Sequence, residues 1–345
     1  MFPPSERRGE RLKPTFQNIA RLAGVGTATV ERVLNGRGGV RPVLVEKVVA
    51  AARALDYPKR LPERHRGILR IDVLLVRPET TFFDRLSQAF KRIGASLDAT
   101  VVLQRVFLDE LDPLSIARRI ADPGTRRAGL IVAAPDHPAI RTALEAVGVA
   151  GIPIVQIVTR TGGIAADYVG IDNYAAGRSA ALFLSRMQPR GGTVVVLCHS
   201  QIYQVQRDRV RGFSDYLAEY PRADLRFTAA LFGQDEAVAC ADRLTTALRT
   251  WPDLVGLYNA GGANSALASV LRRHPRGRDI FFVGHELTER SAAALREGVM
   301  SVVLDQAPEA QARRSVDLML HRLGLVTMEI SASPIRFITV TAESL

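Results

Sequence analysis

The chain has little of what secreted and membrane proteins usually carry. Only two of its 345 residues are cysteine, Cys198 and Cys240, which excludes a disulfide framework and gives no metal-ligand spacing. No apolar run approaches the roughly 20 residues that a membrane-spanning helix needs. Residues 1–14 lack the apolar stretch of a signal peptide, and we expect them to form a disordered arm. These absences predict a cytoplasmic protein with reduced thiols, no bound metal and no membrane contact.

The sequence also lacks catalytic motifs, and its acidic and basic residues are unequal in number. The chain shows no Ser-His-Asp arrangement, phosphate-binding loop or cluster of metal ligands, so we expect neither an enzyme nor a cofactor. Basic residues outnumber acidic ones by 46 to 35. The excess is concentrated in residues 1–66, which hold 14 Lys and Arg against 6 Asp and Glu. A short cationic segment of this kind suits the phosphate backbone of a nucleic acid.

Two short segments with helical periodicity lie within this cationic region. The first has apolar residues at three- and four-residue spacing, at Phe16, Ile19, Ala20 and Ala23. Gly24 follows, and glycine accepts the left-handed conformation that ends a helix. The second segment begins near Thr27 and repeats the pattern at Val30, Val33 and Leu34. Two short helices around a tight turn indicate a helix-turn-helix, whose second helix fits a DNA major groove, although an ordinary helical hairpin has the same spacing.

The detail of this stretch resembles one protein family. Residues 20–35 read A-x-L-A-G-V-x-x-x-T-V-x-R-V-L-N, similar to the headpiece of the lactose-repressor (LacI) family of bacterial transcription regulators. A third amphipathic segment, residues 42–55, follows and runs to Tyr57 as in the family. The resemblance implies a three-helix DNA-binding domain over residues 15–57. It places the residues that contact DNA at Thr15, Thr27, Ala28, Thr29, Arg32 and Asn35.

The resemblance also suggests roles for these residues. Arg32 would bind guanine through O6 and N7, while Thr15 and Asn35 would contact phosphate or sugar. This chain has Gly26 and Glu31 where the family usually has serines, and glycine is a weaker N-cap than serine.

A linker is predicted over residues 58–67, which contain two prolines and four Lys and Arg. In the family this linker forms a hinge helix whose leucine enters the minor groove. Arg66 stands at about that position here. We expect Arg66 either to follow phosphates or a narrow minor groove, or to belong to a plain spacer.

From Leu69 onward the pattern changes to alternating strands and helices. Apolar runs alternate with helical segments of about ten to fifteen residues, which is typical of βαβ units and parallel sheets. The segment resembles the type I periplasmic sugar-binding fold that LacI-family regulators carry as their effector domain. The resemblance rests on the stretches Thr81-Phe82-Phe83, Gly170-Ile171-Asp172-Asn173, Arg207-Asp208-Arg209, Val283-Gly284-His285 and Leu304-Asp305-Gln306.

That fold implies two lobes joined by three crossings of the chain. We expect residues 68–345 to form this effector-binding and dimerisation domain, with crossings near 159–163, 305–306 and 333–334. The N-lobe would comprise about 67–161 and 306–333. The C-lobe would comprise about 162–305 and 334–345.

Candidate ligand-binding residues follow the predicted strands, because ligands of open parallel sheets collect beyond the carboxyl ends of the strands. Two facing lobes make a closable cleft there. Aromatic faces suit the apolar side of a sugar ring, and an arginine fork holds vicinal hydroxyls or a carboxylate. Each residue also has a structural alternative, in the core or in a surface ion pair. The candidates are Phe82, Phe83, Asp136, Thr159, Arg160, Arg209, Asn259, His285, Glu286 and Gln306.

Together these features predict a sequence-specific, DNA-binding transcription regulator, a repressor of carbohydrate metabolism or uptake genes. It would act as a homodimer on a pseudo-palindromic operator and respond to a sugar, sugar acid or polyol between its lobes. The alternatives are a solute-binding protein of a sugar transporter and a regulator without a small-molecule effector.

Overall fold

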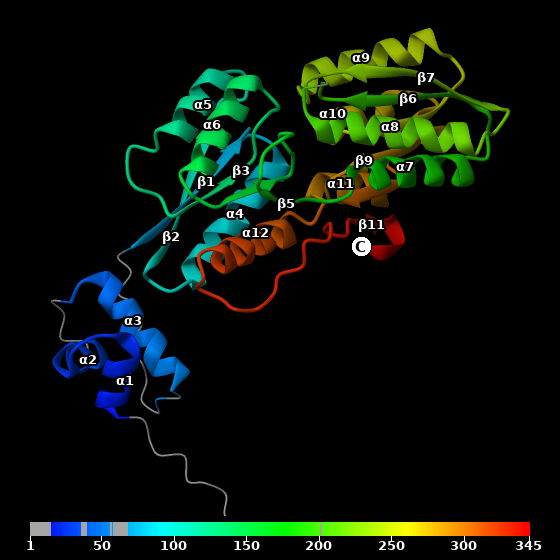
Figure 1. Cartoon of the computed structure of the whole chain (residues 1–345). Helices are drawn as coiled ribbons and strands as arrows, with labels where there is room; N and C mark the ends of the chain where they lie inside the picture. The colour runs from blue at the N-terminus through cyan, green and yellow to red at the C-terminus, as the bar shows by residue number, and fades with distance from the viewer. Residues whose placement is uncertain (1–14, 36–39, 56, 58–67, 201) are drawn as a thin grey trace, which may run out of the picture. The chain divides into compact units, whose positions relative to one another are not determined.

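The chain folds as two separate units. The computed structural model describes residues 15–35, 40–55, 57, 68–200 and 202–345 (Figure 1). It divides into Met1–Gly67 and Ile68–Leu345. The predicted arm, the predicted linker up to residue 67, and Arg66 with it lie outside the described residues. Within the described part of the chain, no helix combines the length and the apolar character needed to cross a membrane.

The described part of the first unit contains three helices whose ends follow the local sequence. They are α1 (Phe16–Ala23), α2 (Thr27–Leu34) and α3 (Pro42–Ala54). The side chain of Thr15 caps α1 by accepting a hydrogen bond from the backbone N–H of Asn18 at 3.3 Å. Gly24 ends α1 in the left-handed conformation, at φ 66°, as predicted. Gly26 occupies the N-cap of α2 without a side-chain hydrogen bond.

A small core holds these three helices together. Its buried residues come from all three and are Ile19, Ala20, Ala23, Val30, Val33, Val48, Ala51 and Ala52. The rings of Phe16 and Tyr57 lie 6.0 Å apart beside this core. Because the apolar residues point inward, the opposite face of α2 is left in contact with solvent.

The second unit contains two β-sheets, each belonging to one lobe (Figure 1). The first sheet has the order β2-β1-β3-β4-β5 and is parallel throughout. Its strands are β1 (Leu69–Val76), β2 (Val101–Leu108), β3 (Gly129–Val132), β4 (Ile154–Ile157) and β5 (Asp167–Val169). The second sheet has the order β11-β10-β9-β8-β6-β7. Its strands are β6 (Gly192–Cys198), β7 (Leu225–Phe232), β8 (Leu254–Asn259), β9 (Phe281–His285), β10 (Val302–Asp305) and β11 (Ile338–Val340). Only β11 departs from the predicted parallel pattern, since it pairs antiparallel with β10.

Helices cover both faces of each sheet. In the first lobe, α4 packs against α12, and α5 packs against α6; these helices are α4 (Thr81–Ser96), α5 (Pro113–Ala121), α6 (Pro138–Val149) and α12 (Pro308–Arg322). In the second lobe they are α7 (Asn173–Met187), α8 (Gln204–Glu219), α9 (Ala237–Thr250), α10 (Asn264–Arg273) and α11 (Glu289–Arg296). Two short 3-10 turns are η1 (Gly277–Asp279) and η2 (Ala342–Ser344).

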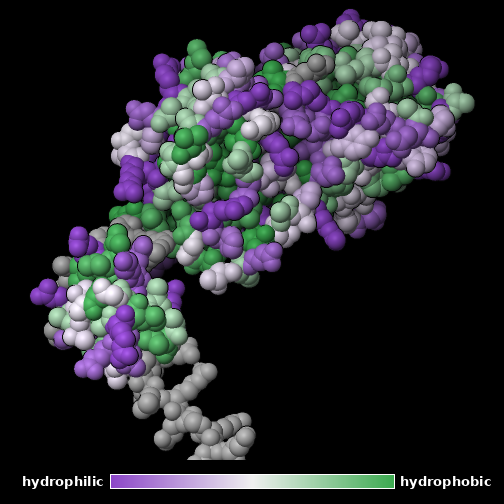
Figure 2. Space-filling view, in the orientation of Figure 1, coloured by the Kyte–Doolittle hydropathy of each residue, from purple (hydrophilic) through white to green (hydrophobic). Residues whose placement is uncertain are grey.

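Successive side chains of β6 belong alternately to two hydrophobic clusters in the second lobe. Val194 and Val196 belong to the same cluster as residues of α7 and α8. Val195 and Leu197 instead join a cluster with residues of α9 and α10. Successive side chains of a strand point to opposite faces, so each face receives its own helix pair. Hydrophilic residues predominate over α7 and α8 in the view of Figure 2.

One predicted boundary is wrong. The crossing expected near residues 159–163 would have placed β5 in the second lobe, but Tyr168 of β5 pairs with Gln156 of β4 in the first sheet. The chain leaves the first lobe only after β5, and Ile171 then bridges to Ile335. A three-residue strand is too short for its hydrophobic pattern to indicate which strand it pairs with, because tertiary contacts set that pairing. The chain returns to the first lobe after β10, where α12 packs on α4, and it ends in the second sheet.

Two glycines allow α7 and α8 to approach each other closely. A Cβ atom at Gly177 would overlap the carbonyl oxygen of Arg209, and a Cβ at Gly212 would overlap that of Tyr174. The helix backbones can therefore meet directly at these points. The close approach fixes the start of α8, which carries Arg209 toward the space between the lobes.

Candidate functional site

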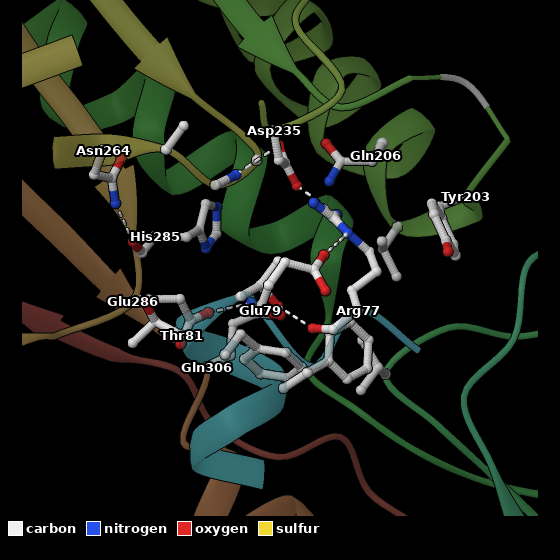
Figure 3. Close-up of a pocket in the computed structure, with 18 of the residues that line it drawn as sticks. Arg77, Glu79, Thr81, Tyr203, Gln206, Asp235, Asn264, His285, Glu286 and Gln306 are labelled. Carbon is white, nitrogen blue, oxygen red and sulfur yellow. Dashed lines mark hydrogen bonds and ion pairs between the residues drawn. The ribbon is translucent and has the colours of Figure 1, made fainter. Parts of the chain in front are cut away.

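A cavity of about 320 Å³ lies between the two lobes (Figure 3). Residues that follow β1 and β4 line it from the first lobe, and residues that follow β6, β7, β8 and β9 line it from the second. It therefore occupies the carboxyl ends of the strands, where the topology predicts a ligand. Its volume is at the lower end of the range for small-molecule sites, which favours a small ligand.

The structure brings most of the predicted ligand-binding residues to this cavity. They come from positions far apart in the sequence, at strand ends, at the crossing after β10 and near the starts of α4 and α8. The predicted residues that line the cavity are Phe82, Phe83, Thr159, Arg209, His285, Glu286 and Gln306.

Three predicted residues do not line the cavity. Asp136 forms an ion pair with Arg141 at 3.0 Å, and Arg160 is exposed with its guanidinium 4.7 Å from the ring centre of Tyr168. Asn259 is fully buried and donates to the side-chain oxygen of Asn264 at 2.7 Å. Each side chain has a local partner that holds it in place, so the prediction of cavity contacts from strand-end position was wrong for these three.

Arg209 forms the charged centre of the cavity's inner end and is 3% exposed. Its three nitrogens donate to Asn173 Oδ1 at 2.8 Å, to the carbonyl of Ala260 at 2.7 Å and to Gln306 Oε1 at 2.5 Å. All three acceptors are neutral, and no carboxylate of the described residues forms an ion pair with Arg209. Burial lowers the pKa of this guanidinium, but arginine remains charged at neutral pH. A buried cation with neutral partners favours ligands that present electron-rich oxygens.

His285, the last residue of β9, and Glu286, which follows it, are neutral hydrogen-bonding groups at neutral pH. Burial, together with the nearby charge of Asp305, raises the pKa of Glu286 to about 8. Glu286 Oε1 accepts a hydrogen bond from Gln306 Nε2. Burial lowers the pKa of His285 well below its ordinary value, so its imidazole is neutral beside the hydroxyl of Tyr258 at 2.9 Å. A protonated carboxyl group can donate to a ligand oxygen, while a neutral imidazole adds no charge.

Part of the wall from the first lobe is apolar. The rings of Phe82 and Phe83 meet edge to face with centres 5.3 Å apart, and both line the cavity. Val158 also lines it and has a φ of 70°, an unfavourable conformation for a β-branched residue. Strain of this kind persists where the surrounding structure imposes it, as happens at binding sites. An apolar wall facing a polar end matches the two-sided chemistry of a sugar ring.

The sequence reasoning missed several polar residues of the cavity, namely Arg77, Glu79, Tyr203, Gln206, Asp235 and Asn264. Arg77 and Asp235 form an ion pair across the cavity, with Arg77 Nη1 at 2.7 Å from Asp235 Oδ2. A signal for both was present, because Arg77 directly follows β1 and Asp235 lies three residues after the end of β7. The strand-end criterion that selected the other candidates applies equally to them.

The first unit presents the predicted DNA-contacting residues on its surface. Thr27, Ala28 and Arg32 are exposed on α2, and Thr29 is half-buried. Thr15 and Asn35 are exposed at the ends of α1 and α2, where the hydroxyl of Thr15 also serves as the helix cap.

Comparison with known proteins identifies both units. A family model described as "Bacterial regulatory proteins, lacI family" matches residues 15–59, and one described as "Periplasmic binding protein domain" matches residues 71–324. The chain belongs to the lacI family of bacterial regulatory proteins. This lacI-family chain is therefore a DNA-binding transcriptional regulator, and its periplasmic binding protein domain is the effector domain, as the sequence predicted.

Individual relatives agree with this assignment. The chain is 29% identical over 332 residues to the HTH-type transcriptional regulator reg1 of Streptomyces lividans, covering 89% of both chains. It is 28% identical over 292 residues to an uncharacterised HTH-type transcriptional regulator of Streptomyces limosus, covering 81% of this chain and 79% of the relative. A solute-binding protein of Burkholderia graminis, solved in complex with D-arabinose, shares the fold with a TM-score of 0.72 and 16% identity. That match covers 81% of this chain and 98% of the solved one.

Proposed function

We propose that this regulator is a sequence-specific repressor of genes for carbohydrate metabolism or uptake, controlled by a sugar, sugar acid or polyol bound between its lobes. The observation that carries the proposal is the composition of the cavity. One end offers Arg209, Gln306 and neutral Glu286 to oxygen atoms, and the other side offers Phe82 and Phe83 to an apolar face. A polyhydroxylated ring needs both surfaces at once.

The DNA contacts follow from the exposed face of α2. In the proposed complex Arg32 binds the O6 and N7 atoms of guanine, and Thr27 and Ala28 contact a thymine methyl group. Thr29 lies beside them, while Thr15 and Asn35 contact the backbone. Arg66 would approach phosphates or the minor groove from the linker.

A homodimer is part of the proposal, because a single three-helix head makes too few contacts to select one genomic site. The edge strands β2 and β7, two of the four in the described sheets, carry exposed large apolar residues, namely Val102, Phe107 and Phe232. Exposed apolar side chains on edge strands are suited to burial against a second copy. We further propose that the regulator is cytoplasmic and has no catalytic activity.

Selection of DNA duplexes from a random pool by the full chain tests the DNA-binding part. We expect a pseudo-palindromic consensus. Arg32→Ala should then reduce the affinity for that consensus by about 1–3 kcal/mol, or roughly 5- to 150-fold. Arg53→Ala, which removes an exposed arginine from α3, is the matched control and should leave the sequence preference intact. Equal binding of all duplexes would contradict the proposal.

Thermal shift with a set of neutral sugars, sugar acids and polyols, including D-arabinose, tests the effector. A ligand that binds only the folded state raises Tm. We expect at least one class to raise the Tm of the effector domain, and Phe83→Ala should abolish the rise. A set without any effect would favour the alternative of a regulator that has no small-molecule effector.

A further inference from the structure

Two groups of side chains join the lobes directly at the outer side of the cavity. Arg77 of the first lobe pairs with Asp235 of the second, as Figure 3 shows, and the distance from Arg77 Nη1 to Asp235 Oδ2 is 2.7 Å. Glu110, also of the first lobe, lies 3.2 Å from Arg77 Nε and 3.3 Å from His199 Nε2 of the second lobe. The hydroxyl of Tyr203, also in the second lobe, donates to Glu110 as well. The contacts of Arg77 with Asp235 and of Glu110 with His199 and Tyr203 must break when the lobes separate.

These contacts are largely shielded from water. The side chains of Arg77, Asp235 and Glu110 are only 10%, 7% and 12% exposed. Ion pairs at this depth are screened less than surface pairs, and the loss of one partner leaves a charge without compensation. The contacts therefore contribute more to lobe closure than exposed ion pairs of the same length would.

Arg77 and Glu110 carry their charges at neutral pH. Burial opposes the charge of Arg77, but the carboxylates of Asp235 and Glu110 raise its pKa above its ordinary value. Burial likewise opposes ionisation of Glu110, yet hydrogen bonds from His199 and Tyr203 and the charge of Arg77 hold its pKa below the ordinary value.

The backbone holds both partners of the main ion pair in place. Asp235 Oδ1 accepts a hydrogen bond from the backbone N–H of Gly262 at 2.7 Å, and a Cβ at Gly261 would overlap the Asp235 carboxylate. Arg77 and Asp235 both have left-handed backbones, at φ 54° and 57°. Non-glycine residues keep such conformations only where neighbouring contacts impose them. The pair is thus built into the strand ends and differs from an ion pair between flexible surface side chains.

We propose that Arg77, Asp235 and Glu110 form a latch that holds the two lobes closed over the cavity through contacts between protein groups alone. Its role in effector control rests on the function proposed above. Because the latch favours the closed state independently of any ligand, it lowers the fraction of molecules that are open to entry. The apparent affinity of an effector depends on such a fraction. Arg77 and Asp235 also line the cavity, so they limit how far a ligand can extend outward.

The interlobe distance in the full chain without ligand or DNA tests the latch. Spin labels at Arg118→Cys in the first lobe and Arg249→Cys in the second occupy exposed positions, and the two native cysteines are buried. Pulsed electron paramagnetic resonance then gives the distance distribution. We expect Asp235→Asn and Arg77→Met to raise the ratio of open to closed molecules by about tenfold, and Arg77→Lys to retain the closed distance.

Asp167→Asn is the matched control, because Asp167 pairs with Arg322 at the same distance of 2.7 Å within the first lobe. It should leave the distances unchanged. Raising NaCl from about 50 to 500 mM should shift the unmodified chain toward the open distance, since added salt screens the pair, and should have less effect on Asp235→Asn. Identical distances for the unmodified chain, Asp235→Asn and Arg77→Met would overturn the latch. This result does not depend on whether a sugar or an operator is ever found.

Discussion

The three-helix head (residues 15–57) and the effector domain (residues 68–345) carry their proposed functional residues in opposite ways. In the head, Arg32 and Thr27 are exposed on α2, above a core of eight small or branched apolar residues. In the effector domain, Arg209, His285 and Glu286 line the cavity and are also buried among hydrogen-bond partners. In the head, the residues proposed to recognise DNA are therefore distinct from the core residues that stabilise the fold. In the effector domain, the residues proposed to bind the ligand are also part of the buried structure. We therefore expect only the head to offer substitutions that change binding without changing stability, or stability without changing binding.

The largest expected effect comes from breaking the core of the head. Ile19 is fully buried, and Ile19→Ala should cost about 2–5 kcal/mol. A three-helix domain of this size has only a few kcal/mol of stability, so the head should unfold and DNA binding should be lost. Calorimetry of the full chain should show that the transition of the effector domain keeps its Tm. A shift of both transitions would show that the two units do not fold independently.

An intermediate effect is expected when the buried carboxyl group of the cavity is neutralised. Glu286 has a pKa of about 8 in the folded chain and 4.5 as its ordinary value. Between these values the unfolded chain has released the proton and the folded chain still holds it, so rising pH favours unfolding. The stabilising contribution is complete below pH 4.5 and is lost as pH rises through about 8.

Glu286→Gln removes this titration and keeps an oxygen for Gln306. We expect its Tm at pH 8 to exceed that of the unmodified chain by several degrees, on the order of 5 °C, with little difference near pH 4.5. Thermal melts across this pH range measure the effect. The same pH dependence in both proteins would assign the titration to other groups and would weaken the contrast drawn with the head.

The smallest effect is expected at the start of α1. Thr15 caps this helix, and Thr15→Ala should destabilise the head by about 1 kcal/mol. Thr15→Ser retains the hydroxyl and serves as the control in melts and DNA titrations. If Thr15→Ala weakens DNA binding at temperatures where the head stays folded, Thr15 has a backbone contact in addition to its capping role. It would then be a position in the head that joins recognition to stability.

The sequence predicted local features better than distant contacts. The end of α1 at Gly24 and the parallel order of the strands follow from conformational preference and periodicity, which act over a few residues. The ion pair of Arg77 and Asp235 joins residues 158 positions apart, so no local sequence pattern predicts that these two side chains meet. Arg160 is placed outside the cavity by a shorter-range contact, that of its guanidinium with the ring of Tyr168.

The antiparallel strand β11 has a consequence for the order in which the protein is made. Residues 338–340 complete the second sheet, while the head is finished by residue 57. At about 5–20 residues per second, a ribosome needs roughly 15–60 seconds to add the intervening chain. During that interval the nascent polypeptide carries a head that has every residue of its core, whereas the second lobe still lacks its final edge. Newly synthesised chains thus acquire the parts for reading DNA before they acquire those for regulation.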